Sequence, residues 1–371
     1  MRFLHPVEVS FPVSQFCQSS DLILTNHNRA KLVDAIAARR KVTLEPWSGH
    51  KMKIHQWIPE SLILFLLSAV SISQAQQKGQ YVPGQYGLNA GVAIMPPPGF
   101  TFANLDFNYS ANALKDSRGS AIPVKGTYSF WSVENIFIYV PESKILGGKF
   151  SSWAAVNWAN GDVTADFQSA KFGINAGGVG LTDTWVQPFN LGWHFPRVDT
   201  WVGYAFVAPT GQFSPGSTSN NGSGYWGNNF ASGTTFYVTK NKATQMNLAT
   251  NWEFHGTKRQ TNIIPGQAFT MEWGVGQIIP LKKDLSRLAQ VGVIGYDQWQ
   301  VTANQGSTAN FPFYSMHAIG LQTNFIAPAK GFSAFFKYLP EYLVKASTQG
   351  RTFVFGFTWT LHDPRLAAPT H

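Results

Sequence analysis

Only a few residues in this sequence have the type and spacing that hydrolytic chemistry requires. Ser315 and His317 stand two positions apart, so they share one face of a strand, where a histidine base could activate a serine. Such a dyad also needs a carboxylate or amide that orients the histidine, and no such partner is evident in the sequence. We therefore predict that the protein has no catalytic residue and is not an enzyme.

Metal, cofactor and nucleic-acid chemistry also lack a signature in the sequence. His, Cys and acidic residues form no cluster with metal-ligand spacing, and neither HExxH nor a phosphate-binding loop occurs. Asp162 and Asp166 are near each other, but we place them in a solvated loop over 160–182. Lys and Arg do not cluster with aromatic residues on one segment, so no nucleic-acid partner is expected. We predict no metal and no cofactor.

Polar side chains that alternate with apolar ones are the better candidates for function. Alternation points successive side chains to opposite faces of a strand, so one face of each such segment is polar and the other apolar. If the apolar face meets lipid, the polar face lines a lumen and offers a polar path or a solute site. The lumen-lining candidates are Asn104, Asp106, Asn108, Asn247, Asn251, Glu253, His255, Glu272, Gln322, Asn324 and Lys337. The alternative is a hydrogen-bonded interior with no such role.

Several positions whose place in the alternation would point them into the lumen are not polar. They are Phe137, Tyr139, Trp153, Phe335 and Leu339. A wide water-filled pore has little use for such residues, whereas a narrow channel or pocket could use them to stack against weakly polar solutes. The same aromatic residues could instead fill the lumen and close it, and the sequence leaves both readings open.

The composition limits the elements that can position these residues. The chain has 371 residues, of which 13% are charged and 15% aromatic. A charged fraction of about 25% is typical of soluble domains. Apolar residues form no run of the roughly 20 residues that a membrane-spanning helix needs, and so many aromatic residues argue against disorder. An aromatic, Gly-rich, charge-poor β protein of one or two domains fits this composition best.

The N-terminal quarter has the layout of an export signal. An apolar stretch over 62–72 lies between Lys53 and the small residues that precede Ala75, which predicts a signal peptide over 52–75, cleaved near Ala75. Residues 1–51 then precede the true start at Met52, as a mis-assigned upstream extension. Removal of 1–75 takes away 8 basic and 5 acidic residues and leaves 20 and 14, and it removes Cys17, the only cysteine. Neither a disulfide nor a thiolate site is then available.

Beyond residue 75, period-two alternation predicts an all-β protein with about twelve strands. The predicted strands span 100–111, 131–140, 147–159, 183–194, 197–208, 225–239, 243–255, 267–279, 288–303, 313–327, 331–343 and 351–361. Their connections alternate between tight turns and longer polar loops, of which 112–130, 160–182 and 209–224 are the longest. This layout is typical of a transmembrane antiparallel β-barrel with short periplasmic turns and long extracellular loops.

A soluble β-sandwich would also alternate, but it would keep charges on its outer face. Fourteen acidic residues over twelve strands are too few to coat such a surface. Aromatic residues fall near the ends of the predicted strands, for example Trp131, Trp193 and Trp226, as interfacial girdles require. We therefore favour the barrel.

Short motifs spread over 81–361 resemble the MetA-pathway phenol-degradation family, whose members are described as outer-membrane β-barrel, transporter-like proteins. The motifs are Pro96-Pro97-Pro98-Gly99, Lys144-Ile145-Leu146-Gly147-Gly148, Gly180-x-x-Asp183-x-x-x-Gln187-Pro188, Leu191-Gly192-Trp193-His194, Ala208-Pro209-Thr210-Gly211, Asn221-Gly222-Ser223-Gly224-Tyr225-Trp226, Pro265-Gly266, and Val293-Ile294-Gly295-Tyr296 with Gln298. The resemblance implies a role in the uptake of aromatic or other hydrophobic compounds. It implies no residue as a binding or catalytic residue.

Together these observations predict an outer-membrane channel or diffusion facilitator for small hydrophobic compounds, aromatic ones among them, in a Gram-negative bacterium. The expected partners are outer-membrane lipid, the solute and, during biogenesis, the barrel-assembly machinery. The domains would be the barrel over 100–361, a C-terminal tail over 362–371, and a Gly/Pro-rich segment over 76–99 that could lie inside the barrel. The alternatives are a structural or surface-interaction barrel with a closed lumen and, less favoured, an outer-membrane hydrolase.

Overall fold

The computed structural model describes residues 79–91, 96–122, 125–167, 172–215, 217, 219–306 and 312–362. The predicted upstream extension, the signal peptide and almost all of the C-terminal tail lie outside these residues. The secondary structure described is nearly all strand. Its elements are η1 (Gly87–Asn89), β1 (Gly99–Leu114), β2 (Lys125–Val140), β3 (Lys144–Ile145), β4 (Gly148–Phe167), β5 (Phe172–Leu181), β6 (Thr184–His194), β7 (Val198–Ala208), β8 (Gly227–Tyr237), β9 (Thr244–His255), β10 (Ala268–Pro280), β11 (Leu288–Gln300), β12 (Ser315–Ala327), η2 (Pro328–Lys330), β13 (Phe332–Lys345) and β14 (Thr348–His362).

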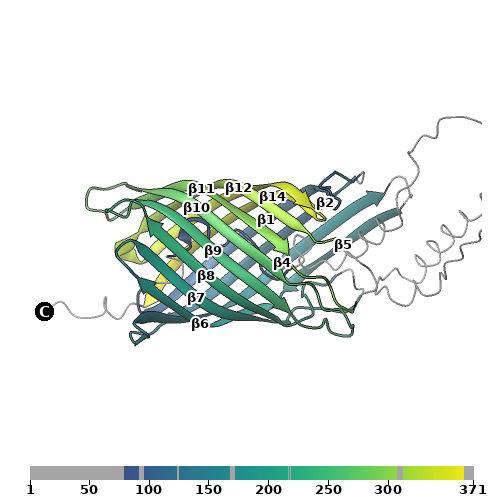
Figure 1. Cartoon of the computed structure of the whole chain (residues 1–371), viewed down its shortest axis with the longest axis horizontal. Coiled ribbons are helices and arrows are strands. Elements are labelled where there is room, and N and C mark those ends of the chain that lie inside the picture. The colour runs from purple at the N-terminus through teal and green to yellow at the C-terminus, as the bar shows by residue number, and fades with distance from the viewer. Residues whose placement is uncertain are drawn as a thin grey trace, which may run out of the picture.

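These strands form a closed antiparallel barrel (Figure 1). Each strand from β6 to β14 pairs with the next, β14 pairs with β1, β1 with β2, and the β2–β4 pairing closes the ring through β4 and β6. β3 is a two-residue stub, and β5 and β6 pair in turn with different halves of β4, so together they make one strand of the wall. The barrel therefore has twelve strands, which confirms the predicted fold class.

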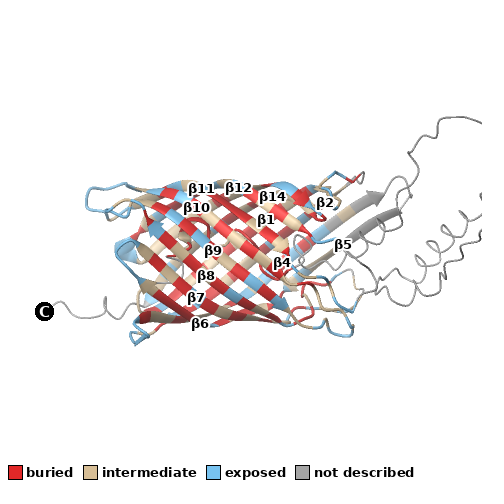
Figure 2. Cartoon of the chain, viewed as in Figure 1, coloured by how far each residue is buried: buried red, intermediate tan, exposed pale blue. Residues whose placement is uncertain are grey.

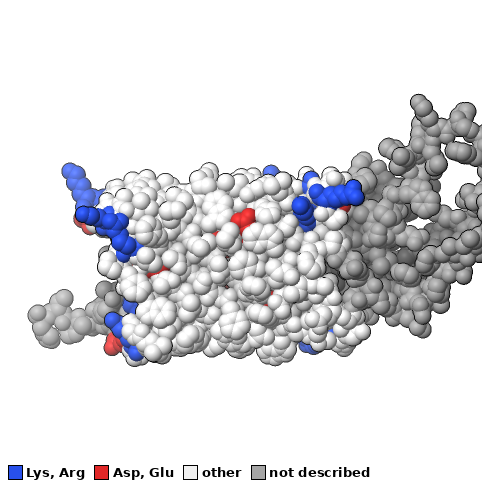
Figure 3. Space-filling view, viewed as in Figure 1, with Lys and Arg blue, Asp and Glu red and all other residues white. Residues whose placement is uncertain are grey.

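Alternation of side chains determines the two surfaces of the wall. Buried and exposed positions alternate along most strands, and Figure 2 shows the pattern as a checkerboard over the wall. Large apolar side chains face outward, among them Phe355 and Trp359 of β14 and Leu248 of β9. Lys and Arg gather at the two ends of the barrel, and the side of the wall seen in Figure 3 is almost free of charge. A charge-poor apolar band of this kind fits the hydrocarbon of a membrane. Among the described residues, no helix has the length and apolarity to cross a bilayer.

The two ends of the barrel differ as alternating tight turns and longer loops predict. One end, here called the turn end, carries short connections and both termini of the barrel sheet, at Gly99 and His362. The connection from β12 to β13 is an example of a short one. Gly331 follows η2 with a φ of 58°, which suits glycine, and its N–H donates to the Pro328 carbonyl. The other end, the loop end, carries the connections over 209–226, 256–267 and 301–314.

Two predicted loops contain strand residues. The predicted loop 112–130 contains the first residues of β2, and the predicted loop 160–182 is mostly β4 and β5, which extend as a hairpin beyond the rest of the wall (Figure 1). Asp162 and Asp166 consequently lie in a strand and not in a loop. Small and polar residues populate this hairpin, and they pair as strands because β2 continues alongside and offers a partner over 160–166.

Candidate functional site: a segment inside the barrel

Residues 79–91, here called the plug, run through the interior of the barrel from the loop end to the turn end. At the loop end, Gln80 Nε2 donates to Ser223 Oγ at 2.6 Å and to the Tyr225 carbonyl at 3.0 Å. At the turn end, the Gly91 N–H donates to Thr235 Oγ1 at 2.8 Å, close to the last residues of β8. The plug therefore occupies the path that a solute would take through the barrel.

Glu272 of β10 holds the middle of the plug through five hydrogen bonds. Its Oε1 accepts from the Tyr81 hydroxyl at 2.6 Å, the Gly84 N–H at 2.8 Å and the Gln85 N–H at 3.1 Å. Its Oε2 accepts from the N–H groups of Tyr86 at 2.8 Å and Gly87 at 3.3 Å. Four consecutive backbone N–H groups thus converge on one buried carboxylate, in the manner of an anion-binding nest.

Lys337 of β13 binds the same turn of the plug, but through the backbone carbonyls and not the N–H groups. Its ammonium is fully buried and donates to the Gly84 carbonyl at 2.8 Å and to the Gln85 carbonyl at 2.6 Å. The peptide groups of 84–85 therefore bridge a buried anion, Glu272, and a buried cation. Because unpaired buried charges are costly, both side chains favour the seated plug.

Glu253 of β9 holds the loop-end half of the plug. Its Oε2 accepts from the N–H groups of Gln80 at 2.7 Å and Tyr81 at 3.0 Å, and lies 3.4 Å from His255 Nε2. His255 is in turn positioned by the Gly266 carbonyl, 2.9 Å from Nδ1. This carboxylate ties the plug to the connection between β9 and β10.

The turn-end half of the plug is held by amides and by close packing. The Leu88 N–H donates to Gln322 Oε1 at 2.9 Å, and Asn324 Nδ2 donates to the Asn89 side chain at 2.9 Å. Leu88 sits over a patch of glycines, where a Cβ at Gly276 would lie 2.8 Å from the leucine side chain. The missing side chain at Gly276 therefore makes room for the plug.

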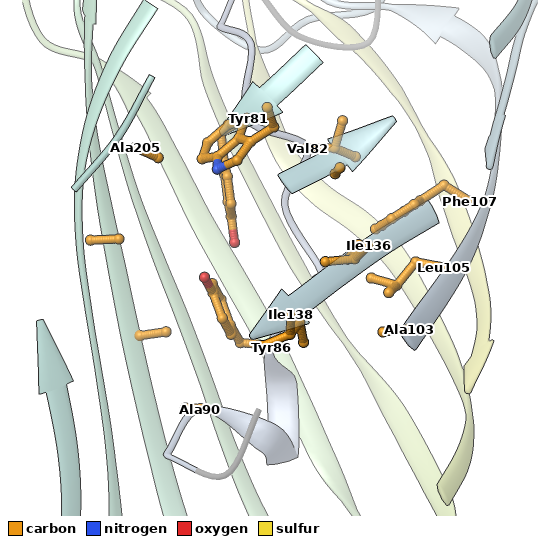
Figure 4. Close-up of a cluster of buried hydrophobic side chains, with 14 of the residues drawn as sticks. Tyr81, Val82, Tyr86, Ala90, Ala103, Leu105, Phe107, Ile136, Ile138 and Ala205 are labelled. Atoms are coloured by element: carbon orange, nitrogen blue, oxygen red, sulfur yellow. The ribbon is translucent and has the colours of Figure 1, made fainter. Parts of the chain in front are cut away.

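The last plug residues meet the wall at β7 and β8. Trp201 Nε1 donates to the Ala90 carbonyl at 2.6 Å, and a Cβ at Gly233 would collide with both of these atoms. Figure 4 shows Tyr81 and Tyr86 of the plug pointing toward each other inside the barrel. Their rings face an apolar part of the wall that includes Leu105 and Ile138. The lumen thus has one polar wall that binds the plug and one apolar wall beside it.

The structure brings eight of the eleven lumen candidates to the inner surface. They are Asn247, Asn251, Glu253, His255, Glu272, Gln322, Asn324 and Lys337. Five of them bond to the plug directly, and His255 and Asn247 reach it through Glu253 and Thr235. Asn251 bonds to Asn229 of β8. Trp153, Phe335 and Leu339 also face inward, as their parity predicts.

The prediction for Asn104, Asp106 and Asn108 is wrong, because β1 presents the other face to the lumen. Its inner residues belong to the apolar wall, so the polar row faces outward. Two of these outward groups are paired: Asn104 Nδ2 donates to Asn135 Oδ1 at 3.1 Å, and Asp106 accepts from Trp131 Nε1 at 2.7 Å. Phe137 and Tyr139 likewise face outward and not into the lumen, since their neighbours Ile136 and Ile138 are buried inside.

Several inner polar residues escaped the sequence analysis. Glu341 accepts from the Tyr109 and Tyr296 hydroxyls at 2.9 and 2.8 Å, and it lies within the predicted strand 331–343 on the same face as Lys337, which is the signal that could have identified it. Gln187, which binds Asn190, lies at a bulge beside Pro188, where alternation breaks down. Glu134 falls in β2, and the alternation of Ser132, Glu134 and Ile136 with outward residues is the signal that could have identified its face.

The serine–histidine pair has a carboxylate after all, but no nucleophile geometry. His317 Nδ1 lies 2.7 Å from Asp297 Oδ1, and Trp273 Nε1 donates to the same carboxylate at 3.1 Å. Within the described part of the chain no hydrogen bond joins Ser315 to His317. Nor do the described residues contain a group of three His, Cys, Asp or Glu side chains that could hold a metal ion.

The fold and its occupied lumen define the class: a transmembrane β-barrel of the outer-membrane type with an internal plug. A profile of the family described as "Putative MetA-pathway of phenol degradation" matches residues 111–357, and the chain belongs to this family. A search of curated proteins found no match.

A solved structure shares the fold of this chain. The chain is similar to the COG4313 outer membrane channel from Pseudomonas putida F1, with a TM-score of 0.61, 11% identity, and coverage of 76% of this chain and 99% of the other. It also matches the β domain of the Bordetella autotransporter BrkA, with a TM-score of 0.42, 11% identity and coverage of 71% and 100%. A FadL homologue from Pseudomonas aeruginosa matches with a TM-score of 0.37, 8% identity and coverage of 74% and 97%. At these identities the similarity to the first structure supports the fold alone.

Proposed function

We propose that the protein is an outer-membrane channel that admits small hydrophobic compounds, aromatic ones among them, into a Gram-negative cell. The observation that carries the proposal is the two-sided lumen. The plug is seated on the polar wall through hydrogen bonds, whereas an apolar wall with Trp153 and Trp185 stands beside it. A solute of low polarity would find surface to pack against there, and water or ions would not.

The plug is held by hydrogen bonds to Glu253, Glu272, Gln322 and Lys337 and by apolar packing, since Tyr81, Tyr86 and Leu88 are buried in the hydrophobic clusters of the barrel. Water can replace the hydrogen bonds one at a time, so their number does not by itself forbid release of the plug. Cleavage near Ala75 would leave only a few residues before the plug. In this proposal the loop end faces the exterior, and the outward apolar band meets outer-membrane lipid after insertion by the barrel-assembly machinery.

Uptake by cells tests the proposal. A deletion strain should take up and grow on low concentrations of toluene or phenol more slowly than the parent strain, and a plasmid copy of the gene should restore the rate. A small hydrophilic sugar should enter both strains equally. Equal uptake of toluene by the two strains would overturn the proposal.

The alternative is a barrel with a permanently closed lumen whose loop-end surface has a structural or binding role. The extent of the plug's hydrogen bonding and the projecting β4–β5 hairpin favour this alternative. Removal of 78–95 should raise small-solute conductance in planar bilayers in both cases. The two functions differ in toluene uptake, which falls on deletion of the gene for a channel and stays level for a closed structural barrel.

A further inference from the structure

A group of polar side chains lies on the outer face of the wall, on the neighbouring strands β1 and β2. It consists of Asn104, Asp106 and Asn108 of β1 and Asn135 of β2, and is here called the outer patch. The residues between them, such as Leu105, are buried on the inner side, so these four side chains point outward. Asn108 is exposed and the other three are partly exposed. The outer patch therefore faces the surroundings of the barrel and not its lumen.

The outer patch lies within the apolar band and not at its edge. Its three β1 residues pair with Phe357, Phe355 and Phe353 of β14, which lie beside them and face outward. Toward the turn end, Phe100 and Phe102 continue the outward row of β1. Because these phenylalanines suit hydrocarbon, the outer patch is a polar spot at membrane depth. Polar side chains at such a depth are costly in contact with lipid and therefore point to a function.

The outer patch keeps hydrogen-bonding groups that no described residue satisfies. Asn104 Nδ2 donates to Asn135 Oδ1 at 3.1 Å, and Asp106 Oδ1 accepts from Trp131 Nε1 at 2.7 Å. Asn104 Oδ1 and Asn135 Nδ2 then have no partner among the described residues, and neither has the amide of Asn108. Lipid tails offer neither donors nor acceptors, so a polar partner at this face would be stabilised.

We propose that the outer patch is the contact between two copies of this chain in the membrane. Both copies have the same orientation in the bilayer, so a two-fold axis along the membrane normal relates them and brings equal depths together. With this axis between β1 and β2, the free Asn104 Oδ1 of one copy faces the free Asn135 Nδ2 of the other, and the reverse pair forms as well. The four amides then close a ring in which each is both donor and acceptor.

Aromatic surface lies beside this polar centre. Trp131 of β2 and Trp158 of β4 are 38% and 45% exposed, and the two strands are neighbours. Tryptophan contributes strongly to contacts between proteins, so the two rings would add apolar packing beside the amides. A second copy supplies donors, acceptors and aromatic surface together, whereas a lipid tail supplies apolar contact alone. The inference goes beyond the proposed transport, since each copy keeps its own lumen.

Energy transfer between labelled copies in liposomes tests the contact. Glu142→Cys introduces a labelling site in the exposed turn that follows β2, and Cys17, the only native cysteine, precedes the predicted cleavage site. Donor-labelled and acceptor-labelled protein are mixed in liposomes and diluted stepwise with lipid. We expect energy transfer that stays above the level of random proximity and that excess unlabelled protein removes.

A double variant tests the amides themselves. Asn104→Leu with Asn135→Leu removes the amide ring and introduces side chains that suit lipid, so the barrel should still fold. We expect association to weaken about tenfold or more, because two amide hydrogen bonds between the copies are lost. The matched control is Ser232→Leu with Thr250→Leu, an outward pair on the far side of the ring of strands whose hydroxyls lie 2.8 Å apart. This control should leave association unchanged, and circular dichroism verifies that both double variants form the barrel.

Each other result overturns the proposal. Energy transfer at the random level in the wild type would show that the protein is a monomer. Equal association of the wild type and Asn104→Leu/Asn135→Leu would place the contact on another face. Native mass spectrometry identifies the remaining case, a monomer with bound lipopolysaccharide that the double variant lacks, in which the outer patch binds lipid and not a second copy. None of these results changes the expectation for toluene uptake, so the transport function is tested separately.

Discussion

The hydrogen bonds to Glu272 give the sharpest test of how the plug is held. Glu272→Gln keeps the size of the side chain and one acceptor oxygen, but it places an NH₂ group where Oε2 now faces the N–H groups of Tyr86 and Gly87. Two hydrogen bonds to a charged group are then lost, each worth about 1.5–3 kcal/mol. The three bonds to Oε1 persist as weaker, neutral ones.

The two lost bonds alone lower the stability of the seated plug by at least about 3 kcal/mol. At about 1.4 kcal/mol for each factor of ten, the ratio of seated to released plug falls about a hundredfold. The neighbouring Lys337 adds to the effect, because its buried charge loses the anion on the far side of the 84–85 peptide. We expect openings of a single molecule to become about a hundredfold more frequent.

Single-channel recording in planar bilayers measures this frequency. The deletion of 78–95 gives the conductance of the released state, and Glu142→Gln controls for loss of a carboxylate elsewhere. Heat-modifiable mobility in SDS gels, the difference in migration between unheated and heated samples, verifies that each variant forms the barrel. An opening frequency of Glu272→Gln within twofold of wild type would show that this carboxylate does not hold the plug.

Three further predictions follow from the same geometry. A Cβ at Gly91 would lie 2.7 Å from the Thr235 Cβ, so the end of the plug must move away by about 1 Å to reach the roughly 3.5–4.5 Å of a disulfide between G91C and T235C. Once formed, this disulfide should suppress openings until reductant is added, as bilayer recording would show. Gly233→Ala should release the turn end of the plug, because its Cβ meets the Ala90 carbonyl, and proteolysis of the plug should become faster; unchanged protection would contradict the contact. Asp106→Leu should cost little barrel stability in urea or guanidinium titrations and leave conductance unchanged, since this side chain faces outward; a change in ion selectivity would place it in the lumen.

The sequence was sufficient to predict the wall but not all of what it encloses. Alternation identified the twelve strands of the wall but not β5, because within the membrane one face must be apolar along its whole length. It placed Glu253, Glu272 and Lys337 inward correctly, since a charge at mid-depth in lipid is costly. The length of β2 and of the β4–β5 hairpin was underestimated, because beyond the membrane neither face needs to be apolar.

The rule that polar faces line the lumen failed where the lumen itself is apolar. On β1 the inward side chains, such as Leu105 and Phe107, belong to the apolar wall. The outward side chains of Asn104 and Asp106 form hydrogen bonds to residues of β2. Parity gives two faces but does not say which one is inside, and here polarity was a misleading guide. Glu134 was missed for the same reason: within the predicted strand 131–140, Phe137 and Tyr139 were assigned to the lumen, which put Glu134 on the outer face.

The most direct test of the proposed channel is the rate at which toluene enters proteoliposomes whose outer leaflet is lipopolysaccharide. Such a leaflet slows hydrophobic solutes, so a protein-dependent rate is measurable above the background. Wild-type protein should raise the entry rate, and the disulfide between G91C and T235C should lower it to that of protein-free vesicles until reductant restores it. Entry through wild-type vesicles at the protein-free rate would contradict the account.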